Sequence, residues 1–514
     1  MMNKYLIGVD IGTNETKGCC CDAQGQVKAV AKRSHHLIIP APGYAEHSPS
    51  MQWWPEFVSI INELITVAGI SNQEIAGIGI SSVMAAITFL DENLQPLRNA
   101  ILYGIDSRSV KQADALNQLI GIDRLIQICG SVCTTESFGP KINWVKENEP
   151  DVFAKTKHIT FASGFLTSQL TGRFCVDKYS VTSAIPMINN TELQWDAEMC
   201  SHVCPISMLP EIMETTDIIG YVTKQAAQET GLAEGTPVIC GTTDAGAEAV
   251  SSGVISPGDT MLMYGSTAFM LHVTDTFPAS DKLWRSPYVL SPYSAICAGT
   301  STAGAVTTWL KQVMGKDLIS LEEQSKGNAF DLLFSEAKDI PLGSDGVMVL
   351  PYFLGQRMPD PNPNASGAIF GLKMHHRRGH IVHATFEGIG YNIAQLISLL
   401  GDQFRDKANI KAIGGGTKTP LWLQIVSDIC GISQAVPEVK IGAAYGDALL
   451  AGLGIGLIQD KDAIKSIIKT DYIIEPDFHN FEKYQKYLEI NKKLYTSTVE
   501  LMSELWATIS GNYV

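Results

Sequence analysis

Two segments far apart in the chain share one pattern: an apolar strand leads into a short turn of glycine and hydroxyl residues and then into a second strand. In residues 6–21 the turn is Asp10-Ile11-Gly12-Thr13, and in residues 260–273 it is Gly265-Ser266-Thr267. Glycine lets such a turn bring backbone N–H groups close to an anion. The repeat predicts two related halves whose turns close on the phosphates of one nucleotide.

Length and composition set the broad class. A chain of 514 residues is too long for one hydrophobic core, so two domains are expected. We place their boundary at the start of the Gly- and Pro-containing segment 253–259, which gives domains 1–252 and 253–514. With 45% hydrophobic and 18% charged residues, the chain has the composition of a globular enzyme. The net charge of -15 repels phosphate backbones and argues against nucleic-acid partners.

The expected compartment is the cytoplasm. The sequence has no basic and apolar leader of the secretory type, and no run approaches the roughly 20 apolar residues of a spanning helix, so no membrane partner is expected. Eleven cysteines, an odd number, favour reduced and mostly buried thiols over a disulfide framework.

Strand-like and helix-like segments alternate along the chain, as in α/β domains. The first three strands are expected to form a meander. Predicted strands cover residues 4–10, 15–22, 26–33, 75–80, 101–103, 236–244, 260–264, 268–273 and 410–413, and predicted helices cover residues 49–68, 245–252, 420–429 and 478–509.

Two carboxylates stand at the ends of predicted strands. Asp10 follows the first strand, and Asp244 follows the strand that begins at residue 236. A carboxylate beside a glycine turn suits a phosphate-bound Mg²⁺. Taken singly, either acid could instead cap a helix or fill a turn. The pair favours catalysis.

Other common nucleotide motifs are missing. Gly315-Lys316 has Leu310 where a phosphate-binding loop of the Gly-x4-Gly-Lys type needs its first glycine. The segment 452–457 breaks the dinucleotide fingerprint. A third glycine turn, Gly414-Gly415-Gly416, joins a strand to a helix and admits a flat ring or a phosphate, although it also fits a flexible turn. The remaining chemistry is phosphoryl transfer from ATP held between two actin-like lobes.

One segment carries a specific resemblance. Residues 367–372, Gly-Ala-Ile-Phe-Gly-Leu, stand before His380-Ile381 and residues 384–387, and together they match the second signature of the FGGY family of carbohydrate kinases. Pro140-Lys141, with Trp144, matches the first signature in part. The resemblance extends over nearly the whole chain. It implies an α/β fold of two RNase H-like domains, of the actin, hexokinase and Hsp70 type, with a cleft between the lobes.

The resemblance also implies roles for individual residues. Asp244 matches the general base that takes the proton of the attacking sugar hydroxyl, and Asp10 and Asp244 are implied to bind Mg²⁺. For Gly304 there is an alternative role, which is to allow close packing of a helix. The residues implied to bind ATP are Gly12, Thr13, Lys17, Gly265, Ser266, Thr267, Gly304, Thr307, Thr308, Gly414, Gly415, Gly416 and Thr419.

The sugar pocket departs from the family pattern. Met84 stands where xylulokinase-like members have Met-His-Gly, but Ala85 replaces the histidine. Tyr103 stands near the family's sugar-facing tryptophan, with core packing as the alternative, and Asp106 stands near the aspartate of its Trp-x-Asp segment with one extra residue between them. We predict that Met84, Tyr103, Asp106 and Asp244 face the sugar.

The predicted function is an ATP- and Mg²⁺-dependent kinase of a small sugar, with a ketopentose such as xylulose or ribulose preferred. The alternatives are a gluconate or polyol kinase and a catalytically silent sugar sensor of the same fold. The resemblance allows a homodimer, but the sequence sets no oligomeric state, no regulation and no phosphorylated hydroxyl.

Overall fold

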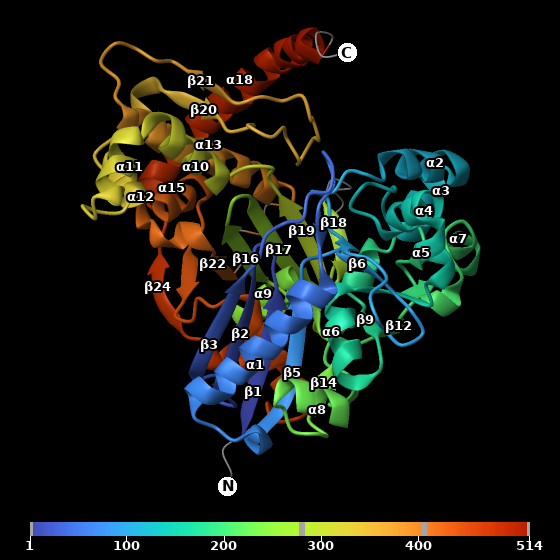
Figure 1. The fold of residues 1–514 in the computed structure, drawn as a ribbon. Helices are drawn as coiled ribbons and strands as arrows, with labels where there is room; N and C mark the ends of the chain where they lie inside the picture. Colours follow the sequence, from blue (N-terminus) through green and yellow to red (C-terminus); the bar gives the residue numbers. More distant parts are fainter. Residues whose placement is uncertain (1–3, 277–282, 402–403, 405–408, 511–514) are drawn as a thin grey trace. The chain divides into compact units, whose positions relative to one another are not determined.

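The computed structural model describes residues 4–276, 283–401, 404 and 409–510, which form two compact units (Figure 1). Unit 1 comprises residues 1–255, 286–294 and 441–468, and unit 2 comprises residues 256–285, 295–440 and 469–514. The predicted domains, 1–252 and 253–514, differ from these units in three segments, because residues 253–255, 286–294 and 441–468 also belong to unit 1.

Unit 1 is built on a mixed sheet with strand order β13-β14-β5-β1-β2-β3. The first three strands are antiparallel neighbours, whereas β5 is parallel to both β1 and β14. All residues of β1 after Tyr5 are buried, in line with their nearly continuous apolar run. The strands are β1 (Tyr5–Ile11), β2 (Glu15–Asp22), β3 (Val27–Ser34), β5 (Ile75–Ser82), β13 (Ile218–Tyr221), β14 (Pro237–Ile239) and β15 (Thr242–Thr243), the last paired with β5.

Helices cover both faces of this sheet. Helix α1 (Trp54–Ala68) packs on β2, where a Cβ at Gly18 would lie 2.3 Å from the side chain of Ile60. Helix α16 (Ala443–Gly454) packs on the other face, against β1 and β5. It approaches β5 so closely that a Cβ at Gly79 would lie 2.1 Å from the carbonyl oxygen of Asp447. Glycine in the strand therefore brings the α16 backbone onto the sheet.

A second core of unit 1 lies beside this sheet. It joins a four-stranded sheet to a group of helices, drawn in cyan and green in Figure 1. Its elements are β4 (Glu46–His47), β6 (Ile87–Leu90), β7 (Ala100–Ile101), β8 (His158–Phe161), α2 (Val110–Ile120), α3 (Ile122–Cys129), α4 (Phe138–Asn148), α5 (Pro150–Lys155) and α7 (Ala197–Ser201). Helices α6 (Ala162–Thr171), α8 (Lys224–Thr230) and α9 (Asp244–Ser251) complete unit 1 together with the short strands β9 (Cys175–Asp177) and β12 (Glu211–Met213).

Unit 2 repeats the strand arrangement of unit 1. Its sheet has the order β18-β19-β17-β16-β22-β23-β24, with β16 antiparallel to β17 and parallel to β22, as β1 is antiparallel to β2 and parallel to β5. The predicted repeat is therefore confirmed at the level of the fold. The strands are β16 (Asp259–Tyr264), β17 (Ala268–Thr274), β18 (Trp284–Pro287), β19 (Ser294–Gly299), β22 (Asn409–Ile413), β23 (Gln434–Pro437) and β24 (Thr470–Ile474).

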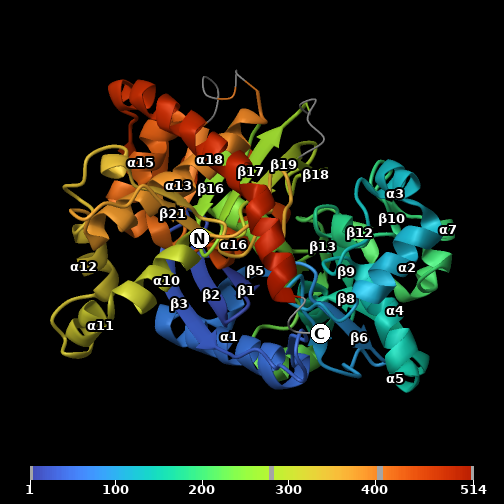
Figure 2. The ribbon, with the colours of Figure 1, turned by 90° about the horizontal axis from the view of Figure 1, so that it is seen from above.

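The helices of unit 2 surround its own core. Helix α18 is one long element that packs on α15 and α13, and Figure 2 shows it in red along the orange part of the chain. The main helices are α10 (Gly304–Met314), α11 (Lys316–Glu323), α12 (Ala329–Ser335), α13 (Arg378–Ser398), α15 (Pro420–Cys430) and α18 (Phe478–Ser510), and the strands β20 (Met348–Leu350) and β21 (Ala368–Phe370) form a separate pair.

Three predicted elements differ in detail. The strand expected over residues 236–244 is split into β14 and β15, because Gly241 adopts φ +77 and passes so close to β5 that a Cβ would lie 2.1 Å from the carbonyl oxygen of Ile80. The helix expected from residue 49 begins as a π-helical turn, Pro49–Trp53. The strand expected over 101–103 is β7, Ala100–Ile101.

All eleven cysteines are buried thiols that take part in no disulfide, as predicted. Among the described residues, no helix combines the length and the apolar character needed to cross a membrane.

Candidate functional site

The site in unit 1 begins where β1 and β5 run side by side. Asp10 lies in register with Ser81 of β5, and the Ser81 hydroxyl lies 2.9 Å from Oδ1 of Asp10. Asp10 is only 9% exposed. Parallel pairing brings both strand ends to one edge of the sheet, as the position of Asp10 after a buried strand predicted.

Asp244 reaches the same edge by a different route. Strand β15 pairs with the end of β5, Thr242 opposite Ser81 and Thr243 opposite Ser82, and α9 begins at the next residue, Asp244. Oδ1 of Asp244 accepts a hydrogen bond of 2.8 Å from the N–H of Ala245. A carboxylate is favoured in the first turn of a helix by the unpaired N–H groups there. The structure therefore brings the two predicted strand-end acids, Asp10 and Asp244, to neighbouring positions.

Three carboxyl groups at this edge of the sheet have raised pKa values. Burial, and then the charge of Asp10, raise the pKa of Asp244 to about 8. Burial also raises the pKa of Asp10 to about 6, against the hydrogen bond from Ser81 and the charge of Lys17. Glu248, one turn after Asp244 on α9, has its pKa raised to about 7 by burial and by Asp10. Carboxylate oxygens gathered in this way are the ligands that a hard divalent cation takes, so the residues present fit Mg²⁺.

The turn between β1 and β2 is fixed by buried polar contacts. The N–H of Gly12 donates to the carbonyl of Glu15 at 3.0 Å, and a ring nitrogen of His35 lies 3.1 Å from the carbonyl oxygen of Gly12. The other ring nitrogen of His35 lies 2.9 Å from Glu56. Lys17 is paired with Glu15, 2.9 Å away, at the start of β2. The turn is thus held in shape without any ligand.

Two predicted site residues contact each other at this turn. The hydroxyl of Thr13, expected to face phosphate, lies 3.0 Å from the hydroxyl of Tyr103, expected to face the sugar. Burial, with smaller effects from the nearby charges of Asp244 and Glu136, raises the pKa of Tyr103. Met84 is half-buried and packs against the second core of unit 1. The side chain of Tyr103 therefore packs against the main core of unit 1, as the alternative expected, while its hydroxyl contacts Thr13; Met84 borders the second core.

Asp106 lies deeper than the sugar contact predicted for it. Its side chain is fully buried, and it accepts hydrogen bonds from the N–H of Ala45 at 2.7 Å and from the guanidinium of Arg108 at 2.7 Å. Arg108 also donates to Glu46 at 2.7 Å and lies over the ring of Tyr44. A buried guanidinium shared by two carboxylates is a stable arrangement when every donor finds an acceptor. Asp106 thus belongs to a buried hydrogen-bonded group with Arg108 and Glu46.

Lys141 on α4 lies near this group and is a buried lysine. It is fully buried, and its ammonium group has no hydrogen-bond partner among the described residues. Burial lowers the pKa of Lys141 to about 7, although the nearby charges of Asp106 and Glu136 oppose this shift. The side chain of Glu136 lies against Gly104, next to Tyr103. An amino group with no hydrogen-bond partner in the described part of the chain therefore lies close to Asp106, one of the residues expected to face the sugar.

Unit 2 holds the second predicted phosphate turn. The N–H of Gly265 donates to the carbonyl of Thr267 at 3.0 Å, and the N–H groups of Ala303 and Ala305 donate to the carbonyl of Ser266 at 2.7 and 3.0 Å. A Cβ at Gly304 would lie 2.6 Å from the carbonyl oxygen of Gly265. The close packing expected as an alternative for Gly304 is therefore present, and it joins α10 to the turn.

The other residues expected to bind the nucleotide lie near the same strand end. Gly414 adopts φ +90, and a Cβ there would lie 2.7 Å from the carbonyl oxygen of Tyr264. A Cβ at Gly416 would lie 2.7 Å from the Cβ of Tyr264, whereas Gly415 has open space around it. Within unit 2 the glycine turn of residues 414–416 thus meets the end of β16. Thr307 is buried and Thr308 is exposed, both within α10, whereas Thr419 is half-buried and lies just before α15.

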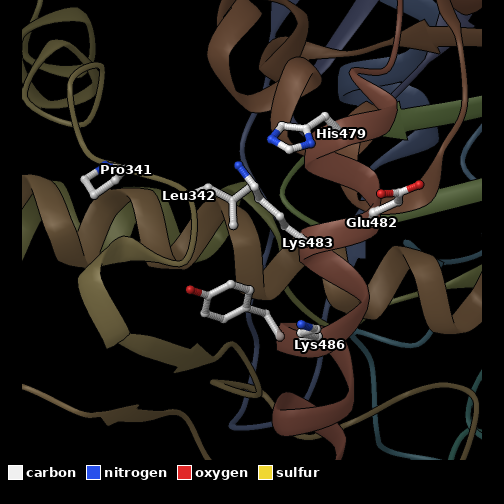
Figure 3. A pocket seen from close by; sticks show the side chains of 7 residues that line it. Pro341, Leu342, His479, Glu482, Lys483 and Lys486 are labelled. Atoms are coloured by element: carbon white, nitrogen blue, oxygen red, sulfur yellow. The ribbon is translucent and has the colours of Figure 1, made fainter.

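Two other features of unit 2 contain none of the predicted site residues. Figure 3 shows a hollow between the turn at Pro341–Leu342 and α18, lined on the helix side by His479, Glu482, Lys483, Lys486 and Tyr487. A surface cluster joins Asp345 to His375, 2.7 Å away, and to His376. Nδ1 of His376 accepts the N–H of Lys373 at 2.9 Å, so the ring proton lies on Nε2. That nitrogen lies 3.6 Å from Asp345, too far for a hydrogen bond, and while it holds the ring proton it has no lone pair for a metal.

Sequence reasoning missed three polar residues of the unit 1 site: Ser81, Glu248 and Asp447. Glu248 stands four residues after Asp244, and this spacing places both on one face of a helix. Asp447 lies on α16, which is near the C-terminal end of the sequence, and its carboxyl lies 2.7 Å from the Ser81 hydroxyl. The signal for that approach was the presence of glycines inside strands, Gly8 and Gly79, which lie against α16.

Both halves of the chain match models of one protein family, and relatives cover nearly its whole length. The model of the FGGY family of carbohydrate kinases, N-terminal domain, matches residues 5–251, and the model of its C-terminal domain matches residues 260–455. A xylulose kinase of Bacillus subtilis is 27% identical over 508 residues, covering 98% of this chain and 99% of the relative. A gluconokinase of Bacillus subtilis is 26% identical over 497 residues, covering 95% of each. The crystal structure of xylulose kinase from Rhodospirillum rubrum superposes with a TM-score of 0.87 at 27% identity, covering 97% of this chain and 100% of that one.

Proposed function

Because the chain belongs to the FGGY family of carbohydrate kinases, we propose that it transfers the γ-phosphoryl group of ATP to a hydroxyl of a small sugar in the presence of Mg²⁺. The observation that carries this proposal is the placement of Asp10 and Asp244 at neighbouring ends of β1 and β15, with the Gly12–Thr13 turn beside Asp10. Phosphoryl transfer needs a positioned base and a charge-neutralising site more than it needs a covalent nucleophile.

Asp244 is the proposed general base. It accepts the proton of the sugar hydroxyl as that oxygen attacks, which requires hydrogen-bond reach and an ionised carboxylate. The raised pKa of Asp244 makes it a stronger proton acceptor than an ordinary aspartate once it is ionised. Asp10 is the proposed cation ligand, and Asp244 adds a second carboxylate to the same cation site. A divalent cation held here would neutralise phosphate oxygens and offset the repulsion between the carboxylates.

The two glycine turns are the proposed phosphate contacts. In unit 1, Gly12, Thr13 and Lys17 surround the turn that follows Asp10, and Lys17 supplies the positive charge. In unit 2, the turn Gly265–Thr267 offers backbone N–H groups and hydroxyls of the kind that bind oxyanions. The remaining proposed nucleotide contacts are Gly304, Thr307, Thr308, Gly414, Gly415, Gly416 and Thr419.

The proposed substrate is a ketopentose such as xylulose or ribulose. Tyr103 and Asp244 would face it, and Met84 would form an apolar border. Ala85 offers no polar side chain where xylulokinase-like members have histidine, so fewer hydroxyl contacts are available on that side.

The second candidate substrate is an aldonate such as gluconate. The observation that favours it is Lys141, whose buried ammonium has no hydrogen-bond partner among the described residues and lies near Asp106 and Glu136. An anionic substrate would supply the hydrogen-bond acceptor that this ammonium lacks among the described residues.

The test is ADP release, measured by a coupled assay with Mg-ATP across ketopentoses, aldonates, polyols and ketohexoses, with a no-sugar control. Turnover that depends on one sugar supports the kinase proposal and identifies the substrate. The variant Asp244→Asn should lose that turnover while retaining ATP binding by calorimetry. ATP binding by the wild type without turnover on any sugar would instead favour a silent sensor.

A further inference from the structure

His35 contacts the turn of residues 12–14, which lies between β1 and β2 and is the proposed phosphate contact of unit 1. It directly follows β3 and is only 5% exposed. Its ring nitrogen Nε2 lies 3.1 Å from the carbonyl oxygen of Gly12, and its backbone N–H donates to the carbonyl of Asn14 at 2.9 Å. One buried histidine therefore binds two residues of the turn, although the chemistry proposed above gives it no role.

The direction of the contact between His35 and Gly12 is set by chemistry. A backbone carbonyl oxygen only accepts hydrogen bonds, so Nε2 of His35 carries a proton and donates it. The other ring nitrogen, Nδ1, lies 2.9 Å from Oε2 of Glu56 on α1, and the hydroxyl of Thr16 donates to the same oxygen at 2.6 Å. Glu56 therefore holds the imidazole ring in the orientation that presents Nε2 to Gly12.

The contact also orients one peptide unit of the turn. In a planar trans peptide the C=O and the N–H point in opposite directions, so holding the carbonyl of Gly12 turns the N–H of Thr13 away from His35. Among the described residues, no carbonyl or side chain accepts a hydrogen bond from the N–H of Thr13. The N–H of Gly12 is already used, because it donates to the carbonyl of Glu15. Thr13 therefore offers a backbone donor of the kind that an oxyanion binds.

The peptide between Gly12 and Thr13 needs such a contact to keep its orientation. Glycine has no Cβ and restricts its backbone angles little, so this peptide can rotate when nothing holds its carbonyl. A donor that must first be ordered binds its ligand more weakly than one that is already in place. The hydrogen bond from His35 removes that cost before the nucleotide binds.

We propose that His35 is a positioning residue, which donates from Nε2 to the carbonyl of Gly12 and so directs the N–H of Thr13 toward a phosphate of ATP. Glu56 acts one step further away, by orienting the ring of His35. This inference rests on the proposed function, since it concerns how the proposed phosphate contact is held. His35 itself touches neither ATP nor the sugar.

The test separates the two nitrogens of the ring. His35→Gln places an amide N–H at the position of Nε2 and keeps the donor to Gly12, whereas His35→Asn places one at the position of Nδ1 and keeps only the side toward Glu56. Binding of Mg-ATP is measured by calorimetry on the sugar-free protein, and kcat and the KM values for ATP and sugar are measured beside it. His383→Asn is the matched control, because His383 is a buried histidine of unit 2 that lies 2.9 Å from Ser344 and is not among the proposed contacts.

We expect ATP binding to weaken about tenfold in His35→Asn and to stay within about threefold of the wild type in His35→Gln and His383→Asn. In His35→Asn the KM for ATP should rise more than the KM for the sugar, a difference that a general loss of stability does not produce. Equal weakening in both His35 variants, or wild-type binding in His35→Asn, would overturn the proposal.

Glu56 gives the same comparison if His35→Asn does not fold. Glu56→Gln keeps an oxygen that can accept from Nδ1, whereas Glu56→Ala leaves the ring of His35 without this partner, so only Glu56→Ala should weaken ATP binding, by about fivefold. Equal ATP binding by the two Glu56 variants would then overturn the proposal. If the wild type binds no ATP, the proposed function fails and this inference with it, whereas normal binding by the wild type leaves the variants to decide the inference alone.

Discussion

The hydroxyl groups of Thr13 and Tyr103 lie 3.0 Å apart, joining the phosphate turn of unit 1 to the residue expected to face the sugar. Tyr103→Phe keeps the ring and removes this contact. We expect turnover to fall by about tenfold, since one aligned hydrogen bond contributes about 1 kcal/mol or somewhat more. Steady-state kinetics in sugar and in ATP measure the change. Unaltered kinetics in both would contradict a role for the contact.

Asp244→Asn is expected to abolish turnover and to stabilise the chain when no divalent cation is present. The raised pKa of Asp244, about 8, means that the folded chain holds this proton more tightly than the unfolded chain. The stability it contributes is therefore present at low pH and is lost as the pH rises through about 8. Because Asp244 is partly exposed, we expect a gain of only about 1–2 kcal/mol at pH 8. Thermal unfolding in a chelator checks this, and equal midpoints for the variant and wild type at pH 8 would contradict it.

His47 is expected to make unit 1 sensitive to acid. Burial, and then the nearby His35, lower the pKa of His47 to about 4, and its Nδ1 accepts the indole N–H of Trp53 at 3.2 Å. The unfolded chain binds this proton below about pH 6.5, whereas the folded chain binds it only near pH 4. Stability is therefore present above pH 6.5 and is lost as the pH falls, by about 2 kcal/mol at pH 5.

The measurement is the change in thermal midpoint between pH 7 and pH 5. His47→Gln should show a smaller change than the wild type, because the glutamine cannot take up a proton. His479→Gln, at an exposed histidine of α18, is the matched control and should behave as the wild type. An unchanged pH dependence in His47→Gln would exclude His47 as the source.

Gly79→Ala is expected to destabilise unit 1 strongly. The added Cβ would lie 2.1 Å from the backbone oxygen of Asp447, and a backbone atom cannot move aside as a side-chain end can. We expect a loss of about 3 kcal/mol or more in the free energy of unfolding. Gly415→Ala is the control, because nothing lies within 4 Å of a Cβ there. Chemical denaturation of both variants checks the prediction, and similar midpoints would contradict it.

Local pattern was enough for the elements next to Asp10. The strands predicted over residues 15–22 and 26–33 correspond to β2, Glu15–Asp22, and β3, Val27–Ser34, because alternation and turn residues act over a few positions. The same reasoning missed the break at Gly241, whose φ of +77 is set by close contact with Ile80 of another strand. The residue pattern of one segment does not indicate which other strand will lie against it.

The candidate site was predictable in part for the same reason. Asp10 lies at the end of β1 and Asp244 directly follows β15, so their own sequence surroundings indicated them. Asp447 lies within an apolar helix and enters the site only because α16 packs on β5. The buried carboxylate of Asp106 likewise depends on Ala45, which stands 61 residues earlier in the sequence. Tertiary contacts of this kind override what a residue's neighbours in sequence suggest.

The return of residues 441–468 to unit 1 has a consequence for synthesis of the chain. When the first 255 residues have left the ribosome, one face of the sheet at β1 and β5 still lacks α16, and its glycines lie uncovered. Unit 1 is complete only after residues 256–285 and 295–440 of unit 2 have been translated. The nascent chain therefore carries an exposed apolar sheet for most of its elongation, a state that invites chaperone binding.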